Sequence, residues 1–190
     1  GAIKQIIHNC TFEQVDVNQF ATFDLEYIFL RIRAKSIGEV TKLKLLCEDD
    51  GETYVAVEVP LEEIEVDFPQ DHKSDIKLTD TIGVVFSYPT YETLAEMNDL
   101  PEEMAGVERV FILMSKCVDR IFDAETVHER IDFNEEELET FLNSLSPQQF
   151  ADVQKFFDTM PKVKYTTTIT NPNTNVENTI DIEGIDSFFI

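Results

Sequence analysis

The first part of the chain repeats apolar residues with the period of an α-helix. In residues 2–10 they recur three or four positions apart, as on one helix face. A second run begins near Thr22, carries Asp24 and Glu26 in its first turn and cations in its last, and ends before Gly38. Its apolar stripe comprises Leu25, Ile28, Phe29 and Ile32. The pattern predicts N-terminal helices in residues 1–36, the first continuing from a preceding segment because it begins without a cap.

Between residues 37 and 89 the pattern changes to a period of two, which is typical of half-buried strands. Apolar side chains alternate in residues 43–47 and again in 55–59, and the Asp50-Gly51 pair between them favours a tight turn. These two runs predict a hairpin with one buried face. Shorter alternating runs follow at 64–68, 76–78 and 82–88. We therefore expect four to five mainly antiparallel strands in this part of the chain.

In residues 90–190 the helical period returns, with a short helix expected at 91–97 and a longer one after it. The longer helix is expected to carry Val107, Val110, Phe111, Met114, Val118, Ile121 and Phe122 on one face. Two further helices are predicted to begin after Asn134 and Ser146, each of which is followed three positions later by Glu or Gln, as in a capping box. The threonine-rich residues 163–182, with a turn at their centre, predict a C-terminal β-hairpin.

These runs together predict an α+β fold in which a β-rich piece lies between helical segments. The expected division is 1–36 for the N-terminal helices, 37–89 for the β-rich subdomain, and 90–190 for a helical region ending in a hairpin. These segments would form one compact domain or two closely packed ones.

The charge of the chain limits the classes of partner that it can bind. It has 38 acidic and 15 basic residues, and its net charge is −23. A field of that sign repels the phosphates of nucleic acids and anionic membranes, so neither is an expected partner. The excess would serve solubility, attract a basic protein or imitate a DNA backbone, and net charge does not separate these roles. An acidic DNA-mimic or inhibitor protein therefore stays an alternative.

The three cysteines, Cys10, Cys47 and Cys117, lie far apart and follow no secretory leader. They are interpreted as free thiols in a reducing cytoplasm. No run reaches the roughly 18 apolar residues of a membrane-spanning helix.

Motifs that carry catalysis or metal binding are not evident. The histidines, His8, His72 and His128, sit in unrelated contexts, and no spacing of His and Cys fits zinc. The acidic residues 48–52 lack the ligand pattern of a calcium loop and are interpreted as a hairpin turn. The acidic residues 135–137 fit the first turn of a helix. We therefore expect no enzyme activity, no cofactor and no metal.

Two features are candidates for protein interaction instead. Five basic residues gather within a short stretch of this acidic chain: Arg31, Arg33, Lys35, Lys42 and Lys44. They would either neutralise a helix end and local strand charges, or dock an acidic partner.

The second feature is aromatic, because the doublets Phe156-Phe157 and Phe188-Phe189 can each bury only one ring well on a single face. Phe157 is expected in the core. Phe188, Phe189 and Ile190, near the C-terminus, are candidate anchors for another protein.

The run from Phe23 to Glu39 resembles a signature segment of the T-even-type bacteriophage baseplate hub family. The C-terminal block is similar to that family's ending, in the order Leu142, Gln149-Phe150, Phe156-Phe157, Met160-Pro161-Lys162, Gly184 and Phe188-Phe189. With residues 2–11, the similarity covers nearly the whole chain. Two departures are an N-terminal segment that family members carry before Gly1, and the acids after Cys47 where some relatives have a second cysteine.

The resemblance implies a non-enzymatic part of the central hub of a contractile tail baseplate. Its partners would be other hub or tail proteins, and its location the virion and, during assembly, the host cytoplasm. It would act as a hub subunit or as an assembly chaperone absent from the mature virion. A homo-oligomer fits the symmetry of tail parts, and a monomeric chaperone would have the same composition.

Overall fold

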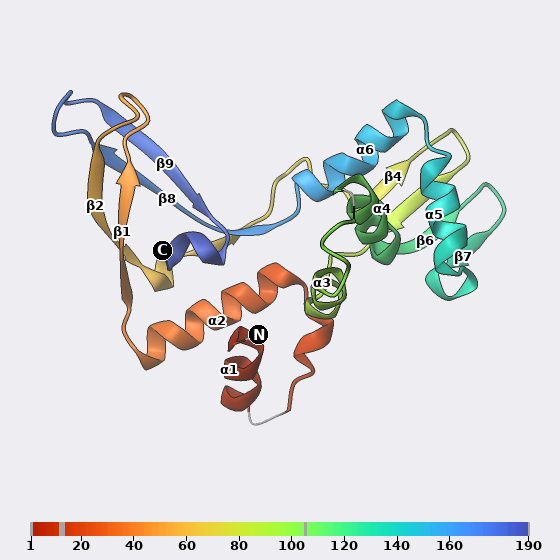
Figure 1. Cartoon of the computed structure of the whole chain (residues 1–190), viewed down its shortest axis with the longest axis horizontal. Coiled ribbons are helices and arrows are strands. Elements are labelled where there is room, and N and C mark those ends of the chain that lie inside the picture. Colours follow the sequence, from red (N-terminus) through yellow and green to blue (C-terminus); the bar gives the residue numbers. More distant parts are fainter. Residues whose placement is uncertain (1, 12–13, 105, 190) are drawn as a thin grey trace. The chain divides into compact units, whose positions relative to one another are not determined.

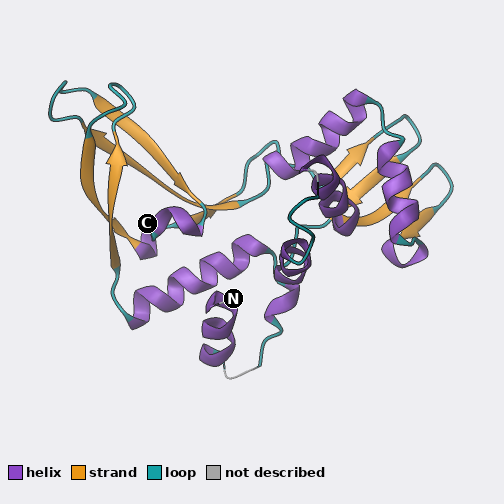
Figure 2. Cartoon of the chain, in the orientation of Figure 1, coloured by secondary structure: helices purple, strands orange, loops and turns teal. Residues whose placement is uncertain are grey.

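The computed structural model describes residues 2–11, 14–104 and 106–189. Among these residues it contains six α-helices and nine strands, and every paired strand is antiparallel (Figures 1 and 2). The predicted α+β class is therefore confirmed. Within the same residues, no helix is both long and apolar enough to span a membrane.

The chain divides into two compact units. The terminal unit comprises Gly1–Val17, Phe23–Asp67 and Pro161–Ile190, and the central unit comprises Asn18–Thr22 and Phe68–Met160. This division differs from the expected one, because the β-rich segment 37–89 is shared between both units. The reason is a long-range pairing in which Glu65 lies opposite Lys164. Local periodicity identifies a strand but does not identify its partner.

The terminal unit begins with helices and contains two separate sheets. Its elements are α1 (Ala2–Cys10), α2 (Thr22–Ser36), β1 (Val40–Leu46), β2 (Tyr54–Pro60), the 3-10 helix η2 (Leu61–Glu63), β3 (Glu65–Asp67), β8 (Lys162–Thr170), β9 (Glu177–Glu183) and the 3-10 helix η4 (Ile185–Phe188). A further 3-10 helix, η1 (Val17–Gln19), has its first residue in the terminal unit and its other two in the central unit. One sheet is the hairpin β1-β2, and the other has the order β3-β8-β9.

The predicted hairpin is confirmed by the pairing of β1 with β2, in which Leu43 lies opposite Val57. Gly51 in its turn has a φ of 67°, a left-handed conformation that favours glycine. The predicted C-terminal hairpin is also confirmed, as β8 and β9. One core cluster fills this unit: Leu30, Ala34, Leu43, Val59, Leu61, Ile64, Val163, Ile182 and Phe188.

Helix α2 is confirmed, but its buried face differs from the predicted stripe. Leu25 is buried as expected, whereas Ile28 and Ile32 are only partly buried and Leu30 and Ala34 reach the core instead. This helix is apolar around much of its circumference, so its periodicity did not single out one face.

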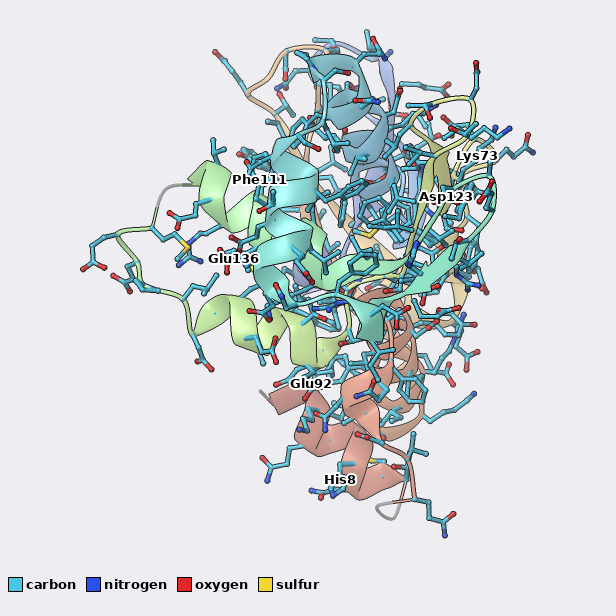
Figure 3. All side chains as sticks on the ribbon, turned by 90° about the vertical axis from the view of Figure 1, so that its right-hand side faces the viewer. His8, Lys73, Glu92, Phe111, Asp123 and Glu136 are labelled. Atoms are coloured by element: carbon cyan, nitrogen blue, oxygen red, sulfur yellow. The ribbon has the colours of Figure 1, made fainter. Side chains whose placement is uncertain are left out.

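The central unit is a four-stranded sheet with helices packed against it. Its elements are β4 (Asp75–Lys77), β5 (Gly83–Phe86), α3 (Tyr91–Asn98), α4 (Gly106–Cys117), β6 (Val118–Phe122), β7 (Val127–Glu129), the 3-10 helix η3 (Arg130–Asp132), α5 (Glu135–Asn143) and α6 (Pro147–Asp158). The strand order is β4-β5-β6-β7. Phe111 on α4 lies against α5 and pairs with the ring of Phe150 on α6, with 5.3 Å between centroids (Figure 3).

The long helix predicted to reach Phe122 is wrong, because α4 ends at Cys117 and the next five residues form β6. Both edges of β6 are paired, with β5 on one side and β7 on the other. Val118, Ile121 and Phe122 are spaced three and four positions apart, so they resemble the continuation of a helix face.

The predicted capping boxes are confirmed. The side chain of Asn134 accepts from the amide of Glu137, and Ser146 and Gln149 are paired in the same way. On α6, however, Phe156 is the fully buried member of its doublet and Phe157 is only partly buried. Phe157, which is expected to pack in the core, lies at the periphery of the buried cluster and packs against it.

Candidate protein-interaction surface

Two of the five predicted basic residues hold α2 to the segment that follows β2. The guanidinium of Arg31 donates to the carbonyl oxygen of Ile64 at 2.8 Å and to Oε1 of Glu65 at 3.0 Å. Lys35, one turn further along α2, forms an ion pair with Glu62, and this pair holds the pKa of the Glu62 carboxyl below its usual range. These two cations therefore serve the fold of the terminal unit.

Lys42 and Lys44 lie on β1, on the strand's exposed face. Lys42 forms a cross-strand ion pair with Glu58 at 3.1 Å, and both side chains are well exposed. Among the described residues, no carboxylate lies within ion-pair distance of Lys44. Three of the five basic residues are thus neutralised locally, which favours the first of the two interpretations for them. That interpretation does not account for Arg33 and Lys44.

Arg33 and Phe189 are brought together by the structure, although they lie at opposite ends of the sequence. The guanidinium carbon of Arg33 lies 4.9 Å from the ring centroid of Phe189. The same ring meets Phe29 edge to face, with 5.9 Å between centroids, and Phe189 remains 39% exposed. We call these three residues the terminal aromatic surface. In the described part of the chain, Arg33 has no carboxylate partner.

Phe188 requires a correction, because it is completely buried and cannot serve as a surface anchor. It belongs to the core cluster of the terminal unit, and its carbonyl oxygen accepts from Oγ1 of the buried Thr41 at 3.0 Å. The turn of η4 places Phe188 inward and leaves Phe189 partly exposed. Ile190, the third predicted anchor, lies outside the described residues.

Glu26, an acidic residue near the start of α2, lies against the C-terminal segment. Burial raises the pKa of this carboxyl to about 7, although it accepts a hydrogen bond from the backbone N–H of Ile185. The nearby carboxylate of Asp186 raises it further. The C-terminal segment is thus in contact with α2 at Glu26 as well as at Phe29 and Arg33.

The acidic turn between β1 and β2 is held by amide side chains of the β8-β9 turn. The carboxylate of Asp49 accepts from Nδ2 of Asn171 at 3.0 Å, from Nδ2 of Asn178 at 2.8 Å and from Oγ1 of Thr174 at 2.5 Å. Asn171 is completely buried and also donates to Asp50. These bonds lower the pKa of Asp49, and they join the tips of the two hairpins, which meet at one end of the terminal unit (Figure 1). In the described ranges, no group of three or more His, Cys, Asp or Glu side chains is placed to hold a metal ion.

His72 lies in the central unit against the rings of Phe156 and Tyr88. Its Nδ1 is 2.9 Å from Oγ1 of Thr159, and that hydroxyl donates its hydrogen to the carbonyl oxygen of Lys155. His72 must therefore donate to Thr159 and is not placed to take a proton from it. Burial lowers the pKa of His72, which favours the neutral ring.

The thiol nearest to His128 in sequence, Cys117, is buried at the end of α4. Burial raises its pKa to about 12, so it is a thiol and not a nucleophilic thiolate at neutral pH. His128 lies on β7 and meets Phe133 edge to face.

A comparison with models of protein families finds one match. The family model described as T4 bacteriophage base plate protein matches residues 1–190, the full chain. No curated protein and no solved structure matches the chain. A match over the whole length shows family membership, with a structural or assembly role in the baseplate of the phage tail. The chain belongs to the T4 bacteriophage base plate protein family.

Proposed function

We propose that this protein works in the central hub of the baseplate, as a subunit or as an assembly factor, by binding other tail proteins and without catalysing a reaction. The full-length family match supports the baseplate role. The terminal aromatic surface supports a role in binding, and it is the observation that carries the proposal.

This surface has the composition of a binding hot spot. Phe189 stands partly exposed between Phe29 and Arg33, and aromatic and arginine side chains dominate the energy of protein interfaces. Among the described residues, no carboxylate pairs with Arg33. Its guanidinium is therefore available to form a bidentate pair with a carboxylate of the bound protein. The expected partner therefore presents an apolar pocket for Phe189 beside an Asp or Glu for Arg33.

The buried Phe188 makes this surface rigid in advance. Its ring lies in the core and its carbonyl oxygen is bonded to Thr41, so the neighbouring Phe189 is ordered before a partner binds. Ordering a flexible anchor on binding would cost affinity, and a preformed anchor avoids that cost.

Quantitative mass spectrometry of purified virions and of infected-cell lysate tests the role, with a known tail component as the internal standard. A fixed ratio in virions is expected for a hub subunit, and presence in lysate with hub complexes but absence from virions is expected for an assembly factor. A protein that sediments apart from hub complexes in lysate and is absent from virions would overturn the proposal.

A further inference from the structure

Among the residues that the structure describes, no strand pairs with the outer edge of β1. The two-stranded sheet contains only β1 and β2, with Lys42 opposite Glu58. The same register continues past the two ends of the hairpin strands. There the amide of Cys47 donates to the carbonyl oxygen of Thr53, and the amide of Leu61 donates to the carbonyl oxygen of Glu39. In an antiparallel pair, bonded residues alternate with non-bonded ones. The odd-numbered residues of β1 therefore direct their backbone groups toward β2, and the even-numbered ones direct theirs outward.

Four residues consequently present their N–H and C=O groups along this edge: Val40, Lys42, Lys44 and Leu46. Their side chains are all exposed. Among the described residues, no backbone or side-chain group forms a hydrogen bond to these outward backbone groups. An open edge of this kind is a template for pairing with another strand.

A groove of about 630 Å³ follows the same edge. It is lined by residues 42–45, together with Tyr54 of β2 and Ser187 of η4. Because consecutive side chains of a strand point to opposite faces, a groove that touches four consecutive residues runs along the edge and not along one face. The bond from Thr41 to Phe188 fixes η4 beside β1 and so fixes the far wall of the groove.

The side chains at this edge indicate the chemistry of the occupant. Among the described residues, no carboxylate lies within ion-pair distance of Lys44. Lys42 is paired with Glu58, but its side chain is 81% exposed, so a ligand carboxylate can share it, and Leu46 and Tyr54 add apolar contact. The net charge of the protein is −23, so an acidic segment is repelled from most of the surface and attracted where these lysines lie.

We propose that β1 binds an extended, acidic segment of another baseplate protein as an added strand on its outer edge. Backbone hydrogen bonds to the even-numbered residues would supply affinity, and alternate carboxylates of the segment would face Lys42 and Lys44. This proposal rests on the proposed function, because that function supplies the class of partner. Lysines on an open edge also prevent edge-to-edge aggregation, and that role alone requires no ligand.

The test is an array of overlapping peptides that cover the phage's own baseplate proteins, probed with the labelled full-length protein. The best binders are expected to be acidic at alternate positions. Double charge reversal, Lys42→Glu with Lys44→Glu, is expected to weaken them at least tenfold. The matched control reverses Lys73 and Lys77, which are exposed lysines of the central unit, and leaves binding unchanged.

Amide hydrogen exchange with the best peptide gives the second readout. We expect the peptide to protect the amides of Lys42, Lys44 and Leu46, while Leu43 and Leu45, already bonded to β2, change little. The proposal is overturned if no peptide binds, if binding ignores the charge reversal, or if these outward amides stay unprotected. Such a failure beside co-purification with the hub would reject only the added strand, whereas loss of hub association would reject the proposed function.

Discussion

Replacing Glu26 with glutamine removes a carboxyl group whose charged form is disfavoured by burial in the folded protein. The unfolded chain has the ordinary pKa of 4.5, and burial raises it to about 7 in the folded protein. The folded state therefore binds the proton more tightly, and the free energy of unfolding falls as the pH rises from about 4.5 to about 7. Glu26→Gln keeps an oxygen that can accept from the Ile185 amide and removes the charge.

The size of this effect follows from the two pKa values. Their difference corresponds to about 3.4 kcal/mol. Because the side chain is partly exposed, solvent screening reduces the expected effect to about 1 to 2 kcal/mol. We therefore expect Glu26→Gln to be more stable than the native protein by that amount at pH 8, and nearly equal to it at pH 4.5.

Urea unfolding followed by circular dichroism, at pH values from 4.5 to 8, measures this difference, since the chain contains no tryptophan for fluorescence. The stability of the native protein is subtracted at each pH, which removes the contributions of the other carboxylates. Several of these have a lowered pKa, so their contribution to stability increases as the pH rises. Glu39→Gln, at an exposed position beyond the end of α2, controls for the loss of one negative charge. A stability difference that is flat with pH, or a variant that is less stable at pH 8, would refute the reasoning.

Two further pairs of substitutions test the packing of the terminal unit. Phe188→Ala should lower the free energy of unfolding by about 3 to 5 kcal/mol because it empties a fully buried site, and Phe189→Ala by about 1 kcal/mol or less; equal effects in urea unfolding would contradict the assignment. Asn171→Ala should cost about 1 to 3 kcal/mol because it removes a buried donor to Asp49, and the exposed Asn173→Ala should cost less, measured in the same way.

Features set by neighbouring residues could be predicted from the sequence. Asp50 and Gly51 define a tight turn through their own side chain and backbone freedom, so the first hairpin was predicted correctly. The helix starts at Asn134 and Ser146 are equally local, since each cap bonds only three residues onward. Such features need no knowledge of the rest of the fold.

Features set by distant residues could not be predicted. The residues from Val118 to Phe122 are a strand because β5 and β7 pair with them, whereas the spacing of their apolar side chains also fits a helix. The pairing of Glu65 with Lys164 joins segments that no periodicity relates. For the same reason the expected segments of the chain differ from its two units.

In the candidate surface, too, the individual residues could be identified from the sequence but their contacts could not. Arg33 and Phe189 were each singled out from the sequence, one by charge clustering and one by its place in a terminal doublet, but only the fold shows that they meet. Which phenylalanine of the doublet is buried depends on the turn of η4, so Phe188 was assigned wrongly. Glu26 carries no local signal, because its pKa depends on the C-terminal segment that packs against it.

The most direct test of the central claim is site-specific photo-crosslinking during infection, with benzoyl-phenylalanine in place of Phe189. The account predicts a crosslink to a protein of the baseplate hub, and it predicts that Arg33→Glu abolishes this crosslink. The same photoreactive residue in place of Phe68, which is 63% exposed in the central unit, is the control and should give little of this product. A crosslink from position 189 only to proteins outside the baseplate, or the same product in equal yield from both positions, would contradict the account.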